Sequence, residues 1–401
     1  MATESLSWPE FIRGAVDEKQ KELKLINQQI HSEPELAYEE HKAHANFVSL
    51  LQSLGFDVTP HAYGLDTAFS AEYGSGGRLV IYNAEYDALP NIGHACGHNL
   101  IATASFAGFL GAAAALKESK VPGRVRLLGT PAEEGGGGKV ILIKNGAFKD
   151  AAACLMTHPG PQYLLSGDVT GVAAVKMLAN VKWRVSFTGQ TAHAAMEPWN
   201  GVNALDAVCL SYNAISMLRQ QIRPHERIHG VFKEAGDRPN VIPGRTIRSD
   251  TLAAAERLWQ RVKQCFEGSA LSTGCKVHYE EINSYADVRS SMAICKEFVA
   301  TMPEGRVSLD EPSDFLAGST DMGNVTYECP GFHGAYGIDT EQGQGNHTKP
   351  FAAAAGLEKS FDRAVEWGKG MAIVGYKILA DDAFNAAVQK DWQEDMKRAT
   401  A

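Results

Sequence analysis

Three neighbouring stretches decide the fold: Arg78–Tyr86 is RLVIYNAEY, Asn99–Leu116 is NLIATASFAGFLGAAAAL, and Gly123–Glu134 is GRVRLLGTPAEE. The first is a short apolar run rich in β-forming residues, which predicts a strand. The second predicts a buried helix whose small residues allow close packing. The third predicts a strand that runs into a loop, and AAACLMTHP (151–159) predicts another strand. This alternation predicts an α/β fold with a mostly parallel sheet and helices on both faces.

Polar residues gather just after the predicted strands. NAEYDALP and HACGHN (83–99), PAEEGGGG (131–138) and THPGP (157–161) each follow a strand end. Ligands of parallel α/β sheets bind beyond the carboxyl ends of the strands. We therefore expect these three loops, distant in sequence, to converge on one site.

The pattern changes after about residue 178. Residues 18–54 have helical apolar spacing and precede the first strand, whereas a smaller α+β pattern follows the sheet segment. That pattern predicts strands at 181–187, 227–233 and 275–282 and helices at 201–222 and 251–266. From about 288 the chain returns to helix and loop and ends in a helical segment at 352–379. The predicted organisation is a main α/β domain formed by 1–177 and 288–401, with a separate α+β domain inserted at 178–287.

Composition excludes several classes of protein. The 401 residues are 44% hydrophobic and 21% charged, with a net charge of −9 and no long Lys/Arg cluster, so we expect no nucleic-acid partner. We find no apolar run of the roughly 18–20 residues that would cross a membrane. The N-terminus lacks an apolar signal core, and the seven cysteines are scattered. We therefore expect a cytoplasmic protein with reduced thiols.

Five side chains in the loops have the chemistry of transition-metal ligands: Cys96, His98, Glu134, His158 and His347. Thiolate and imidazole together favour zinc or a similar ion. Five donors from four loops would serve two metal ions that share a bridging water. Neighbouring residues of an extended segment point in opposite directions, so Glu134 could bind metal while Glu133 faces that water as a general base.

Each of these residues has a simpler interpretation when taken alone. A single cysteine is more often a small buried apolar residue, and a Glu–Glu pair usually lies on a solvated surface. Cys96 could also be the nucleophile of a cysteine protease. That alternative is weaker, because a metal cluster explains Glu134, His158 and His347 whereas a thiol protease has no need of them.

The order of motifs resembles the aminoacylase / carboxypeptidase G family of metal-dependent amidohydrolases. The motifs are SEPELAYEE (32–40), AEYDALP (84–90), GHACGHN (93–99), PAEEGGGGK (131–139), THPGP (157–161), GQTAHAAMEPWNGVNALDA (189–207), RPNVIP (238–243), GSTDMGNV (318–325) and GNHTKPF (345–351). The resemblance runs from about residue 20 to about 370. It is greatest to the aminoacylase-1-like dipeptidase branch, known for β-alanyl-lysine-type dipeptides and related to aminobenzoyl-glutamate hydrolase subunits.

The resemblance implies a role for each matching position. It implies that Cys96, His98, Glu134, His158 and His347 hold two divalent transition-metal ions, with Zn expected first and Mn or Co as alternatives. Glu133 matches the general base, and Asp87 matches the acid that orients a metal ligand. His193 matches a catalytic lid histidine that reaches the partner's active site in dimers, and Asn240 matches a substrate contact. The resemblance leaves open whether Glu85 touches metal.

The family's catalytic domain carries an inserted ferredoxin-like lid that is also its dimerisation domain. The resemblance therefore implies that residues 178–287 form this lid on a catalytic domain of 1–177 and 288–401, and that the protein is a homodimer. One departure concerns that lid, because only GRTI separates Pro243 from Arg248, where relatives carry a longer strand. We therefore expect the lid sheet to lack most of one strand. Such a loss would change the geometry of the dimer and the position of Arg248, which would otherwise contact the substrate.

Three functions fit these observations. The first is a metal-dependent hydrolase that cleaves the amide bond of a dipeptide or N-acyl amino acid by metal-activated water with Glu133 as base. The second is an amide-forming or detoxifying enzyme of a specialised pathway that uses the same site. The third is a catalytically silent dimeric binding protein, and the presence of Glu133 with all five ligand matches argues against it.

Overall fold

The computed structural model describes residues 7–193, 195–232, 244–310 and 318–399. The chain forms two compact units. The main unit comprises Met1–Lys176, Val288–Ala317 and Asp321–Ala401, and the inserted unit comprises Met177–Asp287 with Gly318–Thr320. Each unit has its own sheet and its own hydrophobic core.

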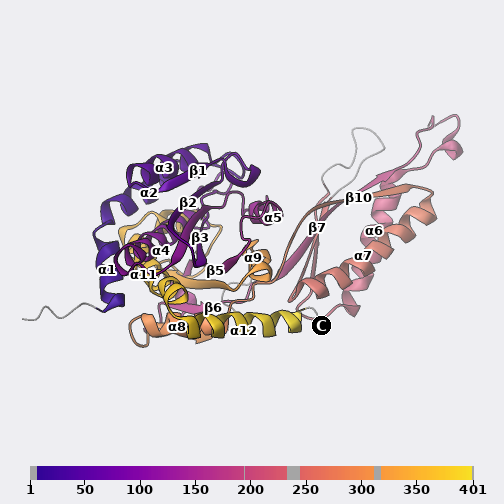
Figure 1. Cartoon of the computed structure of the whole chain (residues 1–401). Helices are drawn as coiled ribbons and strands as arrows, with labels where there is room; N and C mark the ends of the chain where they lie inside the picture. Colours follow the sequence, from indigo (N-terminus) through magenta and orange to yellow (C-terminus); the bar gives the residue numbers. More distant parts are fainter. Residues whose placement is uncertain (1–6, 194, 233–243, 311–317, 400–401) are drawn as a thin grey trace, which may run out of the picture. The chain divides into compact units, whose positions relative to one another are not determined.

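The main unit contains an eight-stranded sheet with the order β1-β2-β4-β3-β5-β12-β6-β11 (Figure 1). Its strands are β1 Asp57–Pro60, β2 Phe69–Ser75, β3 Arg78–Ala84, β4 Gly123–Gly129, β5 Ala151–Pro161, β6 Gly171–Ala174, β11 Val307–Asp310 and β12 Gly331–Ile338. The central strands β4, β3, β5 and β12 are parallel, and β11 is parallel to β6. Strands β1 and β2 add antiparallel pairs at one edge, and β6 is antiparallel to β12. The predicted mostly parallel α/β sheet is confirmed.

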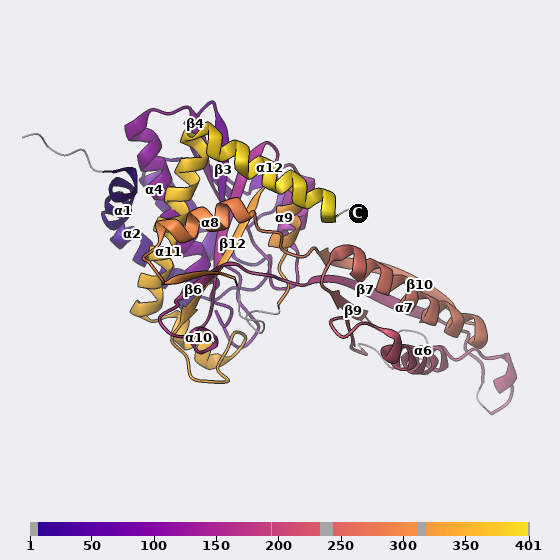
Figure 2. The same ribbon diagram turned by 90° about the horizontal axis from the view of Figure 1, so that it is seen from below.

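Helices cover both faces of this sheet (Figures 1 and 2). They are α1 Trp8–Asp17, α2 Gln20–Ser32, α3 His41–Ser53, α4 His98–Ser119, α5 Gly138–Lys144, α8 Met292–Thr301, α9 Met322–Glu328, α10 Lys349–Ala355, α11 Glu358–Ala380 and α12 Asp382–Ala399. Side chains of a strand alternate between faces. Val80 and Tyr82 of β3 accordingly join the core formed with α4 and α11, whereas Leu79 and Ile81 join the core formed with α5 and α9.

Helix α4 forms the centre of the larger core. It is long and apolar enough to cross a membrane by length and composition, which corrects the expectation that the chain has no such run. The helix is almost entirely buried within the protein, so packing against the sheet and α11 accounts for its apolar character.

The inserted unit is a four-stranded antiparallel sheet with the order β10-β7-β9-β8. Its elements are β7 Ala179–Thr188, α6 Ala204–Leu218, β8 Arg227–Gly230, β9 Gly244–Ser249, α7 Leu252–Thr273 and β10 Lys276–Tyr285. This strand–helix–strand–strand–helix–strand succession is the ferredoxin-like arrangement predicted from the sequence. Trp183 and Trp259 stack in its core with ring centroids 4.8 Å apart.

Several local expectations were wrong. Residues 33–40 interrupt the helical segment predicted over 18–54, because Pro34 disfavours helix in the residue before it. Strands β11 and β12 lie in a segment predicted to contain only helix and loop, and α12 follows the segment predicted to be the last helix. The strand expected to be largely missing from the inserted sheet is present, since β9 pairs with both β7 and β8.

Candidate metal centre

The loops that follow the parallel strands meet at one place in the main unit. Asp87 follows β3, His98 begins α4, and Glu133 and Glu134 follow β4. His158 lies within β5, which continues beyond Pro159 because its parallel pairing with β12 extends to Pro161. The strand predicted over 151–159 therefore extends two residues further than expected. The five predicted ligands come from the three predicted loops and from the loop that holds His347.

Two groups of potential ligands share one sulfur atom. Cys96, His98 and His158 form the first group, and Cys96, Glu134 and His347 form the second. The ligand atoms of each group lie within 4.8 Å of one another. Cys96 Sγ is 3.4 Å from His158 Nε2, and His347 Nε2 is 3.4 Å from Glu134 Oε1. This geometry fits a pair of ions with a thiolate common to both.

Several of these polar atoms are buried without a hydrogen-bond partner among the described residues. They are His98 Nε2, Glu134 Oε1 and Glu85 Oε2. Buried polar atoms are normally hydrogen-bonded, so each such atom needs an explanation. The three atoms lie close together, with His98 Nε2 at 3.6 Å from Glu85 Oε2 and 3.9 Å from Glu134 Oε1. Cations would satisfy them, and the donor set therefore fits a metal site.

The ligand side chains are held in orientation by neighbouring groups. Asp87 Oδ1 lies 3.0 Å from His98 Nδ1, while Asp87 Oδ2 accepts the Glu134 backbone N–H at 2.8 Å. His158 Nδ1 lies 2.7 Å from the Pro159 carbonyl oxygen. In each histidine, a hydrogen bond at Nδ1 leaves Nε2 for a metal. Burial would raise the pKa of Asp87, but His98 and the Glu134 N–H outweigh it and hold that pKa below its usual range.

The protonation states follow from burial. Burial lowers the pKa of His158 to about 4, with a further contribution from His98, so this ring is neutral at pH 7 as a ligand must be. Burial, with the negative charge of Glu134, raises the pKa of the Cys96 thiol. A metal-free Cys96 is therefore a protonated thiol at neutral pH, which argues against the cysteine-protease alternative.

Glu133 and Glu134 both face this cluster. Their carboxylate oxygens each lie 3.9 Å from His98 Nε2. The segment is a turn and not the extended chain expected, so the two side chains do not point in opposite directions. Burial, Glu85 and Glu134 raise the pKa of Glu133 well above its usual range. A carboxylate that faces a group of potential metal ligands is placed where a residue that accepts and returns a proton is needed.

Comparisons with known proteins agree with this geometry. Residues 81–369 match the model of peptidase family M20/M25/M40. The chain is 36% identical over 400 residues to the Xaa-Arg dipeptidase of Mus musculus, covering 94% of this chain and 90% of that protein. The chain belongs to peptidase family M20/M25/M40. The family resemblance drawn from the motifs is thus confirmed, and the chain is an enzyme of a hydrolase family that cleaves amide bonds.

Another relative and two solved structures are also similar to this chain. One of the subunits of the p-aminobenzoyl-glutamate hydrolase of Escherichia coli is 32% identical, over 66% of this chain and 58% of that protein. An aminobenzoyl-glutamate utilization protein from Klebsiella pneumoniae shares the fold with a TM-score of 0.67 at 18% identity, covering 90% of this chain and 97% of that one. A Bacillus subtilis protein described as a dinuclear metal-binding peptidase from the M20 family has a TM-score of 0.60 at 18% identity, with 89% and 98% covered.

One buried network in the M20/M25/M40 site was not anticipated. Lys139 Nζ donates to Glu85 Oε1 at 2.6 Å and to Asp321 Oδ1 at 2.7 Å, with all three side chains fully buried. Burial opposes the charge of Lys139, but Asp321 and Glu85 hold its pKa above the usual value. The signal in the sequence was a lysine at the end of a glycine run and just before VILI. Glu85 also forms a third potential ligand group with His98 and Glu133. Its Oε1 atom is bound by Lys139, which leaves Oε2 to face His98.

The remaining predicted site residues belong to the inserted unit. His193 is exposed, and its Nδ1 accepts backbone N–H groups from Ala195 at 3.2 Å and Met196 at 3.1 Å. Arg248 Nη1 lies 3.5 Å from Ser319 Oγ. Asn240, the predicted substrate contact, lies outside the described residues.

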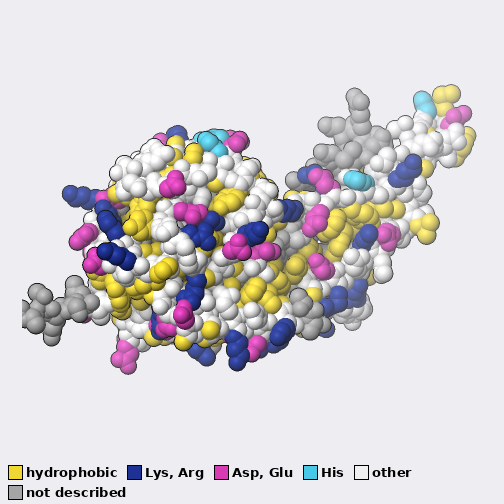
Figure 3. Space-filling view, in the orientation of Figure 1, with side chains coloured by type: hydrophobic (Ala, Val, Ile, Leu, Met, Phe, Trp, Pro, Cys, Tyr) yellow, Lys and Arg dark blue, Asp and Glu magenta, His cyan; other side chains and the backbone are white. Residues whose placement is uncertain are grey.

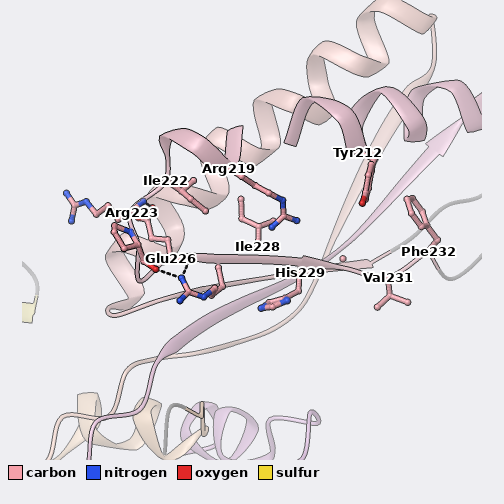
Figure 4. A pocket seen from close by; sticks show the side chains of 12 residues that line it. Tyr212, Arg219, Ile222, Arg223, Glu226, Ile228, His229, Val231 and Phe232 are labelled. Carbon is pink, nitrogen blue, oxygen red and sulfur yellow. Dashed lines mark hydrogen bonds between the residues drawn. The ribbon is translucent and has the colours of Figure 1, made fainter. Parts of the chain in front are cut away.

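The inserted unit also contains a cavity of about 560 Å³ (Figure 4). It lies between the end of α6, the turn that follows and β8. Arg219, Arg223 and Arg227 line it with Tyr212 and Phe232. None of the candidate metal ligands is among the residues that line this cavity.

Proposed function

We propose that this member of the M20/M25/M40 family hydrolyses a dipeptide or N-acyl amino acid at a two-metal centre in the main unit. The observation that carries the proposal is the sharing of Cys96 Sγ by two ligand groups, one completed by His98 and His158 and the other by Glu134 and His347. A thiolate with imidazole ligands favours Zn, and Mn or Co are the alternatives.

The chemistry divides between the ions and the protein. Bound transition-metal ions would supply a nucleophile at neutral pH by lowering the pKa of water from about 15.7 to about 7. Glu133, whose carboxylate faces the ligand groups, accepts the proton of the attacking water and returns it to the leaving amine. Asp87 keeps His98 and Glu134 in place through its two oxygens. No covalent intermediate is required.

His193 is proposed as a donor to the developing oxyanion. Its Nδ1 accepts two backbone N–H groups and is therefore unprotonated, which places the ring proton on Nε2. The ring is exposed, so Nε2–H is available to another group. A preorganised donor of this kind is worth about 3–4 kcal/mol in the transition state.

The substrate class is inferred from relatives and from the site. Two relatives at 36% and 34% identity, from mouse and human, are named Xaa-Arg dipeptidases, and another belongs to a p-aminobenzoyl-glutamate hydrolase. We infer a small amide substrate with a free carboxylate, such as a dipeptide. The amide-forming or detoxifying alternative would use the same residues and differs only in the substrate supplied.

We further propose a homodimer formed through the inserted unit. Apolar side chains reach the surface of the inserted unit (Figure 3), and the exposed apolar residues of α6 include Leu205, Leu210, Tyr212 and Met217. Several exposed apolar side chains on one helix are typical of a protein–protein contact. We also propose a cytoplasmic location, which the seven free cysteines support because reduced thiols are characteristic of that compartment.

The central test combines metal analysis with one substitution. We expect about two transition-metal ions per chain in active protein, and loss of activity on the order of a hundredfold or more in Glu133→Gln with metal content unchanged. Dipeptides and N-acyl amino acids would be screened with the metal-loaded protein. Wild-type turnover by Glu133→Gln would refute the base assignment, and an equal loss of metal would make Glu133 a ligand instead.

A further inference from the structure

The residue before the proposed base has an unusual backbone conformation. Ala132 has φ +61°, in the left-handed region that side chains with a Cβ atom disfavour. The turn that follows is tight, because Gly138 N–H donates to the Ala132 carbonyl at 3.3 Å and a Cβ on Gly138 would lie 1.8 Å from the Pro131 oxygen. Ala132 therefore begins the turn that directs Glu133 towards the metal ligands.

A buried carboxylate from a distant segment holds this residue. Glu40 Oε1 accepts the Ala132 backbone N–H at 2.9 Å, and Glu40 Oε2 accepts the Thr67 hydroxyl at 2.8 Å. The Glu40 residue is fully buried and lies just before α3. Hydrogen bonds to an ionised carboxylate are stronger than those between neutral groups, so this contact can offset the unfavourable backbone conformation.

Glu133 is held from both sides in the same way. The Glu134 N–H donates to Asp87 Oδ2 at 2.8 Å, so buried carboxylates accept the N–H groups immediately before and after Glu133. The segment that carries Glu40 makes a second contact with the turn, from Tyr38 Oη to the Gly136 carbonyl at 2.8 Å. The orientation of Glu133 thus depends on residues about a hundred positions earlier in the chain.

We propose that Glu40 is a positioning residue that keeps Ala132 left-handed and thereby directs Glu133 to the reacting water. This inference rests on the proposed function of Glu133 as the base. The cost of the arrangement supports it: burial, with the charge of Asp87, raises the pKa of Glu40 to about 7, so an ionised carboxylate here opposes stability. A buried group that destabilises the fold is expected where function requires it, and Glu40 bonds directly to the turn that carries Glu133.

Two substitutions of similar size separate the hydrogen bond from packing. Glu40→Met removes the acceptor, and we expect kcat to fall on the order of 10²-fold while KM and metal content stay near their wild-type values. Glu40→Gln keeps a neutral acceptor, and we expect kcat to remain within about tenfold of wild type. Thr67→Val is the matched control, since it removes the partner of the other Glu40 oxygen and leaves Ala132 bound. We expect its kcat to stay within about twofold, because the carboxylate–Ala132 bond persists.

A double-mutant cycle tests whether Glu40 acts through Glu133. Adding Glu40→Met to Glu133→Gln is expected to lower the residual kcat by less than about twofold, because the base that Glu40 positions is already absent. Ala132→Gly in the Glu40→Met chain is expected to recover about tenfold in kcat, since glycine adopts positive φ without steric cost. Thermal unfolding checks that each variant is folded. If Glu40→Met does not fold, Glu40→Asp replaces it, because its shorter side chain cannot reach both partners.

The outcomes distinguish this proposal from the one on which it rests. Three results would overturn the role of Glu40 and leave the role of Glu133 intact. They are a wild-type kcat in Glu40→Met, a full loss of kcat when Glu40→Met is added to Glu133→Gln, and a loss of kcat in Thr67→Val equal to that in Glu40→Met. Wild-type turnover by Glu133→Gln alone would overturn the proposed base and the role of Glu40 with it.

Discussion

At the scale of single residues, Cys96 links the two ligand groups on which the proposed metal centre rests. Its sulfur belongs to both ligand groups, whereas His158 belongs to one of them. Removing the sulfur therefore weakens both metal positions, and removing the His158 imidazole weakens one.

We expect Cys96→Ala to retain less than one metal ion per chain and His158→Ala to retain about one, compared with about two in the wild type. Cys295→Ala is the control, because this cysteine is equally buried and donates to the Ala173 carbonyl away from the cluster. Elemental analysis after dialysis measures the content. Two ions in Cys96→Ala would contradict a shared thiolate.

Glu40 gives a residue-scale prediction for stability. Its pKa is about 7 in the folded chain against an ordinary 4.5, so the ionised form is disfavoured on folding. The resulting destabilisation is absent below pH 4.5, develops as pH rises, and is complete above about 7. Glu40→Gln cannot ionise, so its free energy of unfolding relative to wild type should increase between pH 5 and 8 by up to about 3 kcal/mol.

Chemical denaturation at several pH values measures this change. Glu118→Gln is the control, since Glu118 is exposed on α4 and its substitution should leave the pH dependence of unfolding close to that of the wild type. If the difference in free energy of unfolding between Glu40→Gln and wild type is also constant with pH, ionisation of Glu40 does not destabilise the fold.

At the scale of elements, α4 depends on glycine for its place against the sheet. A Cβ atom on Gly108 would lie 2.7 Å from the Tyr82 ring and 3.5 Å from Met371 Cβ of α11. Gly14 of α1 is also helical, but a Cβ atom there would meet nothing within 4 Å. The two glycines thus share a conformation and differ in their surroundings.

We expect Gly108→Ala to lower the free energy of unfolding by about 1–3 kcal/mol through overpacking. Gly14→Ala should raise it by up to about 1 kcal/mol, because alanine favours helix more than glycine does. Thermal or denaturant unfolding of the two variants provides the comparison. Equal effects would mean that α4 does not pack against Tyr82 as closely as described.

At the scale of the whole molecule, the proposed dimer and the role of His193 can be tested together. Glu133 lies in the main unit and His193 in the inserted unit. If His193 serves the partner's site, a mixed dimer of Glu133→Gln and His193→Ala chains contains one site with both residues intact. We expect each variant alone to lose about two to three powers of ten in turnover and the exchanged mixture to regain part of it.

Subunit exchange is followed with differently tagged chains, and size-exclusion chromatography with light scattering gives the oligomeric state. If the subunits exchange and turnover does not recover, His193 acts in the site of its own chain. A monomeric molecular mass in solution would contradict the proposed dimer. In that case a substitution of an exposed α6 residue, such as Met217→Asp, should leave the measured molecular mass unchanged.

The sequence by itself determined the α/β class, the ferredoxin-like insertion, the family and the residues that form the cluster. These features depend on local periodicity and on side-chain types that follow predicted strand ends, and both are readable along the chain. Only the tertiary structure decided that Cys96 is common to two groups, that Lys139 joins Glu85 to Asp321, and that Glu40 holds Ala132. It also revealed β12, whose glycine-rich sequence GFHGAYGI has little strand character of its own and becomes a strand by pairing with β5. The physical reason is the same in each case: these contacts join segments that are some forty to two hundred and fifty residues apart, and no local pattern records which distant group will meet a backbone N–H, a charge or a strand edge.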